Sequence, residues 1–288
     1  MHGTSVSSLG LARTFLFVPG DRQERLARAL ASGADAVIVD LEDAVSPERK
    51  AEARALVDDG FAGLPATAHA RLLVRMNAAD TPWHGEDRAL LGRLAAHGRL
   101  AGVVLPKAER SADLAALARD VGPAVALLPL VESVAGLDAV DALAVAPQVL
   151  RLIFGHLDFQ ADAGLACGAD ESELVPVRLA LVLATRRAGL APPVDGVTAD
   201  WRDVARLASD AARARRGGFG AKLCIHPDQV AGVQATFTPG ADELTWARRV
   251  RDAVGAAGGG VVNVDGKMVD APILKLAERL LAQASETT

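Results

Sequence analysis

The sequence predicts an α/β protein built as a (β/α)8 TIM barrel with a C-terminal helical extension. Short apolar, β-branched runs recur along the chain, and longer stretches with helical spacing separate them. Continuously apolar strands that alternate with helices indicate a parallel sheet covered on both faces. About eight such units fit this length, which favours a closed barrel. A doubly wound open sheet is the alternative, but no GxGxxG follows the first run.

The predicted strands are eight apolar runs, in the order FLFVP, AVIVDLED, RLLVRMN, GVVLPK, AVALLPLVES, VLRLIFGHLD, PPVDGV and AKLCIHP. Apolar side chains at helical spacing predict helices between them, in RQERLARALASG, PERKAEARALVDDGF, ADLAALARD, ELVPVRLALVLATRRAG and WRDVARLASDAARARRGG. Strand and helix therefore alternate along most of the chain.

The pattern changes beyond Pro239. One helix is predicted from Asp242 to Val254, and a Gly-rich break and the segment VVNVDGKMVDAP separate it from a last helix. The polar residues in that segment exceed what a closing helix requires. We therefore expect residues 1–240 to form the barrel and residues 241–288 to form an extension.

Composition excludes several classes of protein. Half of the 288 residues are hydrophobic, and the formal net charge of −5 comes from interspersed acids and bases, which predicts a soluble globular protein without a nucleic-acid or membrane partner. Cys167 and Cys224 form no CxxC pair, so a reducing cytoplasm is expected. The first residues lack the pattern of a secretory signal, and no apolar run approaches the roughly 20 residues of a membrane span.

Polar residues follow nearly every predicted strand, at the end that carries catalysis in a TIM barrel. Glu132 and Asp158 end adjacent predicted strands, whose backbones lie about 5 Å apart, so their carboxylates are candidates to bind one cation. Oxygen ligands without a His or Cys cluster favour Mg²⁺. The alternative is a pair of rim acids that cap helices or pair with arginines.

Three more charged residues are candidates at this end of the barrel. Arg75 emerges from an apolar strand and is suited to bind a carboxylate or a polarised carbonyl oxygen. We interpret Glu42 as a possible partner of Arg75, and Asp43 as an acceptor for metal-bound water. An N-cap cluster ahead of the helix that begins near Pro47 explains either acid equally well.

Backbone and basic groups complete the candidate site. Gly155 and the following amides of His156 and Leu157 are candidates for a small anion-binding nest. Lys107 ends a predicted strand, and we favour phosphate or carboxylate binding over a Schiff base, since its neighbours are charged. His226 and His156 are interpreted as hydrogen-bonded rim histidines, because no nucleophile accompanies them.

The motifs FVPGDR, VDLEDAVSPERKAEAR, VRMN, VLPKAE, LVES, FGHLDF, KLCIHPDQV and GKMVDAP, taken in order, resemble the citrate lyase β-subunit-like (CitE-like) family of CoA-ester lyases within the HpcH/HpaI aldolase superfamily. The resemblance extends from about Arg13 to the last helix. It implies a cytoplasmic, Mg²⁺-dependent TIM-barrel lyase that forms homotrimers or hexamers. Its partners would be an acyl-CoA thioester and a 2-oxoacid. The enzyme would join these two compounds into malyl-CoA, citramalyl-CoA or a related 3-hydroxyacyl-CoA, or release them by cleaving it.

The resemblance also implies roles for single residues. Glu132 and Asp158 match the metal ligands, and Arg75 matches the residue that contacts the reacting carbonyl or thioester oxygen. Asp43 matches the acid that holds metal-bound water. Asp270 matches an acid on a C-terminal lid that reaches the site of a neighbouring subunit.

Two departures and three alternatives remain open. GFGAK lacks the acid that often precedes its Gly-Lys pair, and His156 and Phe159 replace the commoner acid-containing loop. The alternatives are a malyl-CoA thioesterase, a CoA-independent 2-oxoacid aldolase, and the β subunit of a citrate lyase complex that acts on citryl-ACP. Malyl, methylmalyl, citramalyl and citryl groups differ too little for the sequence to choose among them.

Overall fold

The computed structural model describes residues 8–285. The chain divides into two compact units, Met1–Gln234 and Ala235–Thr288. The first unit contains the barrel and the second contains the C-terminal helices, and each has an apolar core of its own.

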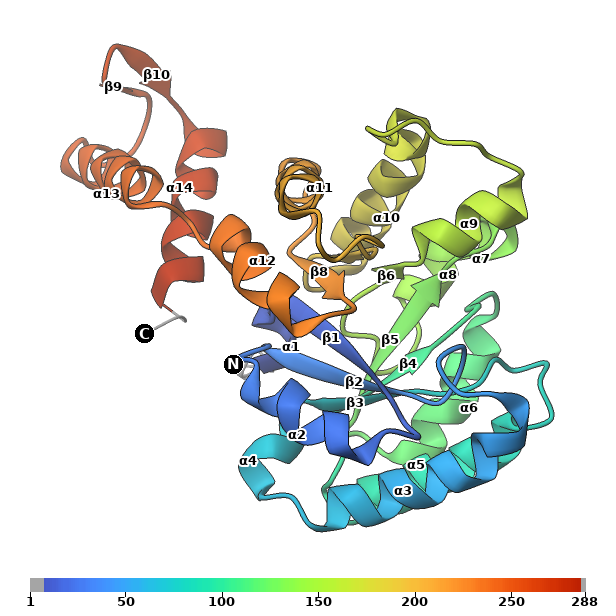
Figure 1. Ribbon diagram of the computed structural model, residues 1–288. Coiled ribbons are helices and arrows are strands. Elements are labelled where there is room, and N and C mark those ends of the chain that lie inside the picture. Colours follow the sequence, from blue (N-terminus) through green and yellow to red (C-terminus); the bar gives the residue numbers. More distant parts are fainter. Residues whose placement is uncertain (1–7, 286–288) are drawn as a thin grey trace. The chain divides into compact units, whose positions relative to one another are not determined.

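A closed barrel of eight parallel strands forms the centre of the first unit (Figure 1). The strands follow one another around the barrel in chain order, and β8 pairs with β1 to close it. Their bounds are β1 Thr14–Pro19, β2 Ala36–Asp40, β3 Leu72–Arg75, β4 Gly102–Leu105, β5 Ala126–Val131, β6 Ile153–Phe154, β7 Val194–Asp195 and β8 Ala221–Cys224. The (β/α)8 barrel predicted from the sequence is confirmed.

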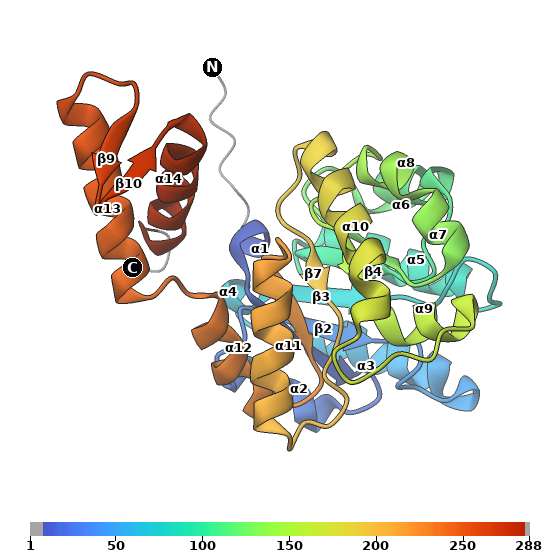
Figure 2. The same ribbon diagram turned by 90° about the horizontal axis from the view of Figure 1, so that it is seen from above.

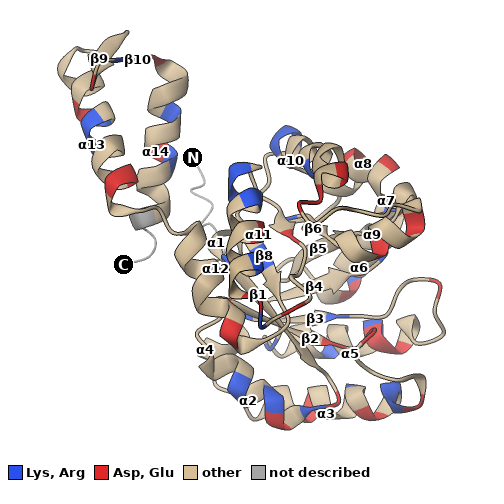
Figure 3. Cartoon of the chain, turned by 45° about the horizontal axis from the view of Figure 1, so that its top comes forward, with Lys and Arg blue, Asp and Glu red and all other residues tan. Residues whose placement is uncertain are grey.

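Helices surround the strands, as the view from above shows (Figure 2). Their bounds are α1 Ser8–Leu11, α2 Gln23–Ala31, α3 Lys50–Ala62, α4 Ala66–His69, α5 His84–Ala96, α6 Ser111–Val121, α7 Val134–Asp138, α8 Val140–Ala144, α9 His156–Ala163, α10 Val175–Ala188, α11 Val204–Arg216 and α12 Val230–Phe237. Short 3₁₀ turns are η1 Pro47–Arg49, η2 Ser172–Leu174 and η3 Pro227–Gln229. Acidic and basic residues are interspersed along α3 and α5 (Figure 3).

Seven helices were not predicted from the sequence: α1, α4, α5, α7, α8, α9 and α12. The clearest error concerns α9, because the predicted strand VLRLIFGHLD ends at Phe154 and the chain turns into a helix after Gly155. His156 and Phe159 are both buried and lie three residues apart, which is the spacing of one helical face. The prediction that Asp158 ends a strand is therefore wrong.

The barrel interior is filled by one apolar cluster to which every strand contributes. Its members alternate along the strands, and they include Phe15, Ala36, Ile38, Leu73, Val104, Leu128, Leu130, Ile153, Val194, Ala221 and Leu223. Since side chains two residues apart on a strand share a face, the inward series continues from Ile38 to Asp40, from Leu73 to Arg75 and from Leu130 to Glu132. The interior thus becomes charged at the carboxyl ends of these strands.

The second unit contains two helices and a hairpin. α13 (Ala241–Ala256) and α14 (Ala271–Ser285) pack with the antiparallel pair β9 (Val262–Val264) and β10 (Lys267–Val269). Asp265 and Gly266 form the two-residue turn, and both have positive φ angles, as a type I′ turn requires. Among residues 8–285, no helix is long and apolar enough to cross a membrane.

Candidate active site

Arg75 is the centre of a buried ion-pair cluster at the carboxyl ends of β2 and β3. Its Nε and Nη2 each donate a hydrogen bond of 2.7 Å to one oxygen of Asp40. Its Nη1 lies 2.9 Å from Glu42 Oε2 and 3.4 Å from Asp43 Oδ2. The predicted contact between Arg75 and Glu42 is therefore present, but the bidentate partner is Asp40.

The loop after β2 is fixed by two buried side chains. Asp40 accepts backbone N–H groups from Glu42 and Ala44, at 2.9 and 3.1 Å. Lys50 Nζ donates to the carbonyl oxygens of Leu41 and Glu42, each at 2.7 Å. These bonds hold Glu42 inward, while the side chain of Asp43 stays 65% exposed. In this arrangement Lys50 supports the loop and Asp43 faces solvent.

Glu132 ends the inward series of β5 and is 3% exposed. Its Oε1 accepts the backbone N–H of Lys107 at 2.8 Å. Lys107 has φ of 45°, an unusual backbone conformation for a residue other than Gly, and such strain is concentrated at functional sites. Within the described part of the chain, no donor is bonded to Glu132 Oε2.

Gly155 provides the space beside this carboxylate. A Cβ atom at residue 155 would lie 2.5 Å from Glu132 Oε2 and 2.6 Å from Glu132 Cβ, closer than side chains tolerate. Gly155 is also the N-cap of α9, where the first N–H groups of the helix, including those of His156 and Leu157, have no acceptor within the helix. This backbone is available to an anion beside Glu132.

Asp158 lies in the first turn of α9 and its side chain is exposed. Although it is not at the end of a strand, its charge is near enough to raise the pKa of Glu132. Among residues 8–285, no three His, Cys, Asp or Glu side chains are grouped so that they hold a metal ion by themselves.

The cluster carries more negative charge than its own cations balance. Burial, followed by the charge of Glu42, raises the pKa of Glu132 to about 8, and burial raises the pKa of Glu42 to about 7 despite Arg75. A small divalent cation fits here, since Mg²⁺ typically takes one or two carboxylates and completes its shell with water and substrate oxygens. The accessible Oε2 of Glu132 and the space at Gly155 suit that mode of binding.

Lys107 contributes a charged amine to the same site. Its side chain is half exposed and its Nζ lies 3.8 Å from Glu42 Oε1. Partial burial lowers the pKa of Lys107, but the carboxylates of Glu42 and Glu132 outweigh this effect and raise it overall. A Schiff-base nucleophile needs a lowered pKa, so the environment favours the charged, anion-binding role that was predicted.

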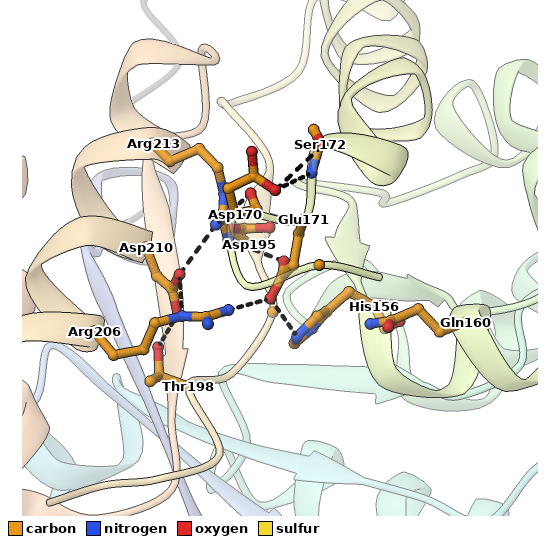
Figure 4. Close-up of polar contacts among 12 residues, drawn as sticks. His156, Gln160, Asp170, Glu171, Ser172, Asp195, Thr198, Arg206, Asp210 and Arg213 are labelled. Carbon is orange, nitrogen blue, oxygen red and sulfur yellow. Dashed lines mark hydrogen bonds and ion pairs between the residues drawn. The ribbon is translucent and has the colours of Figure 1, made fainter. Parts of the chain in front are cut away.

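His156 is not a rim histidine, and that prediction is wrong. Its ring is buried, and its Nε2 lies 3.7 Å from Glu171, which also contacts three arginines (Figure 4). The arginines are Arg178, Arg206 and Arg213, at 2.5, 2.8 and 2.9 Å. Burial lowers the pKa of His156. Any contact of His156 with a substrate would therefore come from its backbone.

This second ionic cluster lies outside the barrel wall. Val194 and Leu223 face the interior, so their neighbours Asp195 and Lys222 point outward, toward the helices. Lys222 Nζ donates to the carbonyl of Gly196 at 2.6 Å, and Asp195 pairs with Arg178 at 3.0 Å. Lys222 is therefore a structural residue between the sheet and the helices.

Asp270 and Asp40 are the remaining acids of interest. Asp270 precedes α14 in the second unit, where its Oδ1 accepts the N–H of Ile273 at 3.3 Å, as an N-cap does. Asp40 was not predicted as a site residue, although its position two residues before Glu42 places both on one strand face. The alternation of side chains along the strand could have identified Asp40 as a site residue. The sequence pattern does not, however, tell whether Arg75 pairs with Asp40 or with Glu42.

Comparison with known proteins identifies the family of this chain. A family model described as HpcH/HpaI aldolase/citrate lyase matches residues 13–227. A citrate lyase subunit beta-like protein of Deinococcus radiodurans is 35% identical over 281 residues, covering 94% of this chain and 97% of the relative. A (3S)-malyl-CoA thioesterase and an L-malyl-CoA/beta-methylmalyl-CoA lyase, both of Cereibacter sphaeroides, are 33% and 32% identical, with 94% of each chain covered.

A solved structure extends the similarity to the whole fold. The CitE protein of Mycobacterium tuberculosis, in complex with magnesium, acetoacetate and coenzyme A, superposes with a TM-score of 0.82 at 34% identity, covering 95% of this chain and 98% of that chain. The family match and this structure agree with the closed barrel. The chain belongs to the HpcH/HpaI aldolase/citrate lyase family, among the citrate lyase β-subunit-like proteins.

Proposed function

We propose that this protein is an Mg²⁺-dependent carbon–carbon lyase that cleaves, or forms, a 3-hydroxyacyl-CoA such as malyl-CoA or citramalyl-CoA. The products of cleavage are acetyl-CoA, or a related acyl-CoA, and a 2-oxoacid. The observation that carries the proposal is the buried, under-neutralised pair of Glu132 and Glu42 beside Arg75. That arrangement suits a site that receives a cation together with an oxygen-rich substrate.

Glu132 and Asp158 would hold the metal. Mg²⁺, when bound, supplies a Lewis acid and a template for the oxygens of the substrate. The N–H groups of His156 and Leu157 and the amine of Lys107 would bind the carboxylate of the 2-oxoacid. Asp43 would accept a hydrogen bond from water in the same site. These groups fix the substrate relative to Arg75.

Arg75 would stabilise the charge that develops during cleavage. When a base takes the proton of the 3-hydroxyl group, the C–C bond breaks, the 3-carbon becomes the carbonyl of the 2-oxoacid, and the electron pair of the broken bond passes to the thioester and forms the enolate of the acyl-CoA. Nη1 of Arg75, which contacts Glu42 and Asp43, would donate to that enolate oxygen, because Asp40 occupies Nε and Nη2. Glu42, which contacts both Arg75 and Lys107, would keep these two cations oriented before the substrate arrives.

The extension of residues 241–288 would act as a lid that packs on a neighbouring subunit of a homotrimer or hexamer. Asp270 would take a proton from the acetyl methyl group in the condensing direction and return it during cleavage. Two features of Asp270 support this proposal. It lies directly after the β9–β10 hairpin, and its N-cap hydrogen bond uses only Oδ1, so Oδ2 could accept a proton. Closure of the lid would also exclude water from the enolate.

A thioesterase is the second candidate function. The malyl-CoA thioesterase and the malyl-CoA lyase of Cereibacter sphaeroides are almost equally similar to this chain. Both reactions use a bound malyl-CoA-like thioester, and they differ in whether water attacks the acyl carbon. The same groups that stabilise an enolate oxygen would stabilise the tetrahedral oxyanion of hydrolysis.

The first prediction concerns the products. With Mg²⁺, malyl-, β-methylmalyl-, citramalyl- and citryl-CoA are offered separately, and mass spectrometry identifies what is released. We expect at least one ester to yield an acyl-CoA and a 2-oxoacid, and Glu132→Gln to reduce that turnover at least about 100-fold, because several kcal/mol of metal stabilisation depend on this carboxylate. Glu24→Gln, at an exposed acid of α2, is the matched control.

Other products would reject the lyase. Free CoA and an intact hydroxydiacid indicate the thioesterase. Turnover of CoA-free 2-oxoacid aldols alone indicates the simple aldolase. Activity that appears only with citryl-ACP and added partner subunits indicates a citrate lyase β subunit.

A second prediction follows from the space beside Glu132. Gly155→Ala places a methyl group 2.5 Å from Glu132 Oε2, so the carboxylate has to move. We expect kcat/KM to fall by about 100-fold, the order of loss that a misplacement of about 1 Å causes, and Mg²⁺ affinity to weaken. Gly85→Ala is the control, because no atom lies within 4 Å of the position that its methyl group would take. Equal activity of the two variants would contradict the assigned role of Glu132.

A third prediction uses the pH dependence of stability. The pKa of Glu132 is raised from 4.5 to about 8, so between these values the folded state binds a proton that the unfolded state has released. Raising the pH across this range therefore lowers the free energy of unfolding of the metal-free protein. In EDTA, the wild type should lose stability relative to Glu132→Gln from about pH 5.5 to about pH 8.5, and Mg²⁺ should restore it.

Urea unfolding at both pH values measures this difference. The Gln side chain keeps an oxygen for the Lys107 N–H and does not titrate, so it isolates the contribution of the carboxylate. A stability difference between the two proteins that does not change with pH would rule out the raised pKa.

A fourth prediction concerns the lid. Asp270→Asn should slow exchange of the acetyl-CoA methyl protons with deuterated water by about 100-fold or more, since general acid–base groups contribute about that much, while KM for the CoA ester changes little. Asp265→Asn, in the neighbouring hairpin turn, is the control. Mixing Asp270→Asn with an Arg75→Gln variant tests whether the lid serves another subunit. Recovery of activity in the mixed oligomer is expected, and its absence would contradict the proposal that Asp270 serves a neighbouring subunit.

A further inference from the structure

We propose that Asp40 is the positioning residue of the active site: it fixes the plane of the Arg75 guanidinium and ties it to the loop that carries Glu42 and Asp43. This inference rests on the proposed function for its kinetic part. The structural part, that the orientation of Arg75 depends on the Asp40 carboxylate, is independent of any substrate.

The register of the barrel places the two side chains opposite each other. Asp40 and Arg75 are paired across β2 and β3, and both belong to the inward series of their strands. Asp40 is 2% exposed, so the pair is almost completely removed from water. A buried charge without its partner is strongly unfavourable, so the folded protein is most stable when Asp40 and Arg75 are paired.

The hydrogen bonds of Asp40 are distributed in a specific way. Each of its oxygens accepts one N–H from Arg75 and one from the backbone of its own loop. Oδ1 is bonded to Arg75 Nε and Glu42 N, and Oδ2 to Arg75 Nη2 and Ala44 N. One carboxylate therefore couples the strand that carries Arg75 to the loop that carries Glu42.

This distribution of hydrogen bonds decides which nitrogen of Arg75 faces the other acids of the site. The bidentate bonds fix the guanidinium as a plane, and the ring of Phe17 lies 4.9 Å from its central carbon. Nη1 is the nitrogen that the carboxylate of Asp40 leaves, and it points to Glu42 and Asp43. A substrate oxygen that binds Arg75 thus meets a donor of fixed direction.

Asn at residue 40 tests the arrangement sharply. An amide has one acceptor oxygen, so in either orientation its NH₂ group faces two N–H donors that the carboxylate now accepts. Arg75 then loses its second bond and its fixed plane. We expect Asp40→Asn to reduce kcat about 10- to 100-fold with a smaller change in KM, since it disturbs orientation and not the groups that touch the substrate.

Asp35→Asn is the matched control, because it makes the same substitution beside the opposite end of β2. Asp35 also accepts backbone N–H groups, from Arg13 and Thr14, and pairs with an arginine. It lies at the amino end of the strand, away from the proposed site. We expect Asp35→Asn to lower the urea midpoint while kcat and KM stay near wild type. Asp40→Glu is the second variant, which keeps the charge if Asp40→Asn does not fold.

Two further measurements separate positioning from a general structural effect. In an Arg75→Gln background, Asp40→Asn should cause little additional loss of kcat, since it acts through Arg75. The reaction of Arg75 with phenylglyoxal, mapped by mass spectrometry, should be several-fold faster in Asp40→Asn and in Asp40→Glu than in wild type or Asp35→Asn. This second measurement needs no substrate.

The outcomes are distinct. If no ester of the panel is turned over but Arg75 becomes reactive in the Asp40 variants, the proposed function fails and the positioning of Arg75 stands. Unchanged Arg75 reactivity in a folded Asp40 variant overturns the inference, whatever the activity. So does an equal loss of kcat in the wild-type and Arg75→Gln backgrounds.

Discussion

Burial of carboxylates at the mouth of the barrel is the constraint from which the chemistry of this site follows. Glu132, Glu42 and Asp40 lie at the carboxyl ends of β2 and β5 or just beyond them, next to the apolar interior of the barrel. All three are almost completely removed from water. Burial raises the pKa values of Glu132 and Glu42, and the charge of Arg75 offsets this effect only in part. A cation that binds such a site would stabilise the folded protein.

The two ionic clusters of the barrel differ in what surrounds them. The cluster of Glu171 lies between the strands and the outer helices, where three arginines pair with Glu171, Asp195 and Asp210, so its charges balance (Figure 4). It is sealed by its own partners and holds the first turn of α9 in place through His156. The cluster of Arg75 lies on the inward face, where negative charge prevails. Only the second has a reason to attract a cation.

The fold was predictable from the sequence because its determinants are local. Eight apolar runs and helical spacing between them recur with little interruption, and each observed barrel strand lies inside a predicted run, except that β1 begins one residue earlier, at Thr14. The errors occur where one apolar run contains two elements, as at Phe154 and His156, because periodicity does not mark the point where a strand turns into a helix. The ion pairs were less predictable. Arg75 was expected to meet Glu42, yet the bidentate partner is Asp40, since the choice between two acids on one face depends on the register of β2 and β3.

The register of the strands also explains why a substitution of Asp40 is expected to affect both Arg75 and Glu42. Parallel pairing sets Asp40 beside Arg75, and the alternation of side chains brings Glu42 to the same face. Gly20 lies next to this point, where a side chain would come within 2.9 Å of the Asp40 carbonyl, so the β1 and β2 backbones approach closely only because residue 20 has none. The position of Arg75 is thus determined by backbone pairing on one side and by the loop after β2 on the other. Under the proposed function, a lyase and a thioesterase that share these restraints would differ in what reaches the acyl carbon, and that difference would have to come from groups other than Asp40 and Arg75.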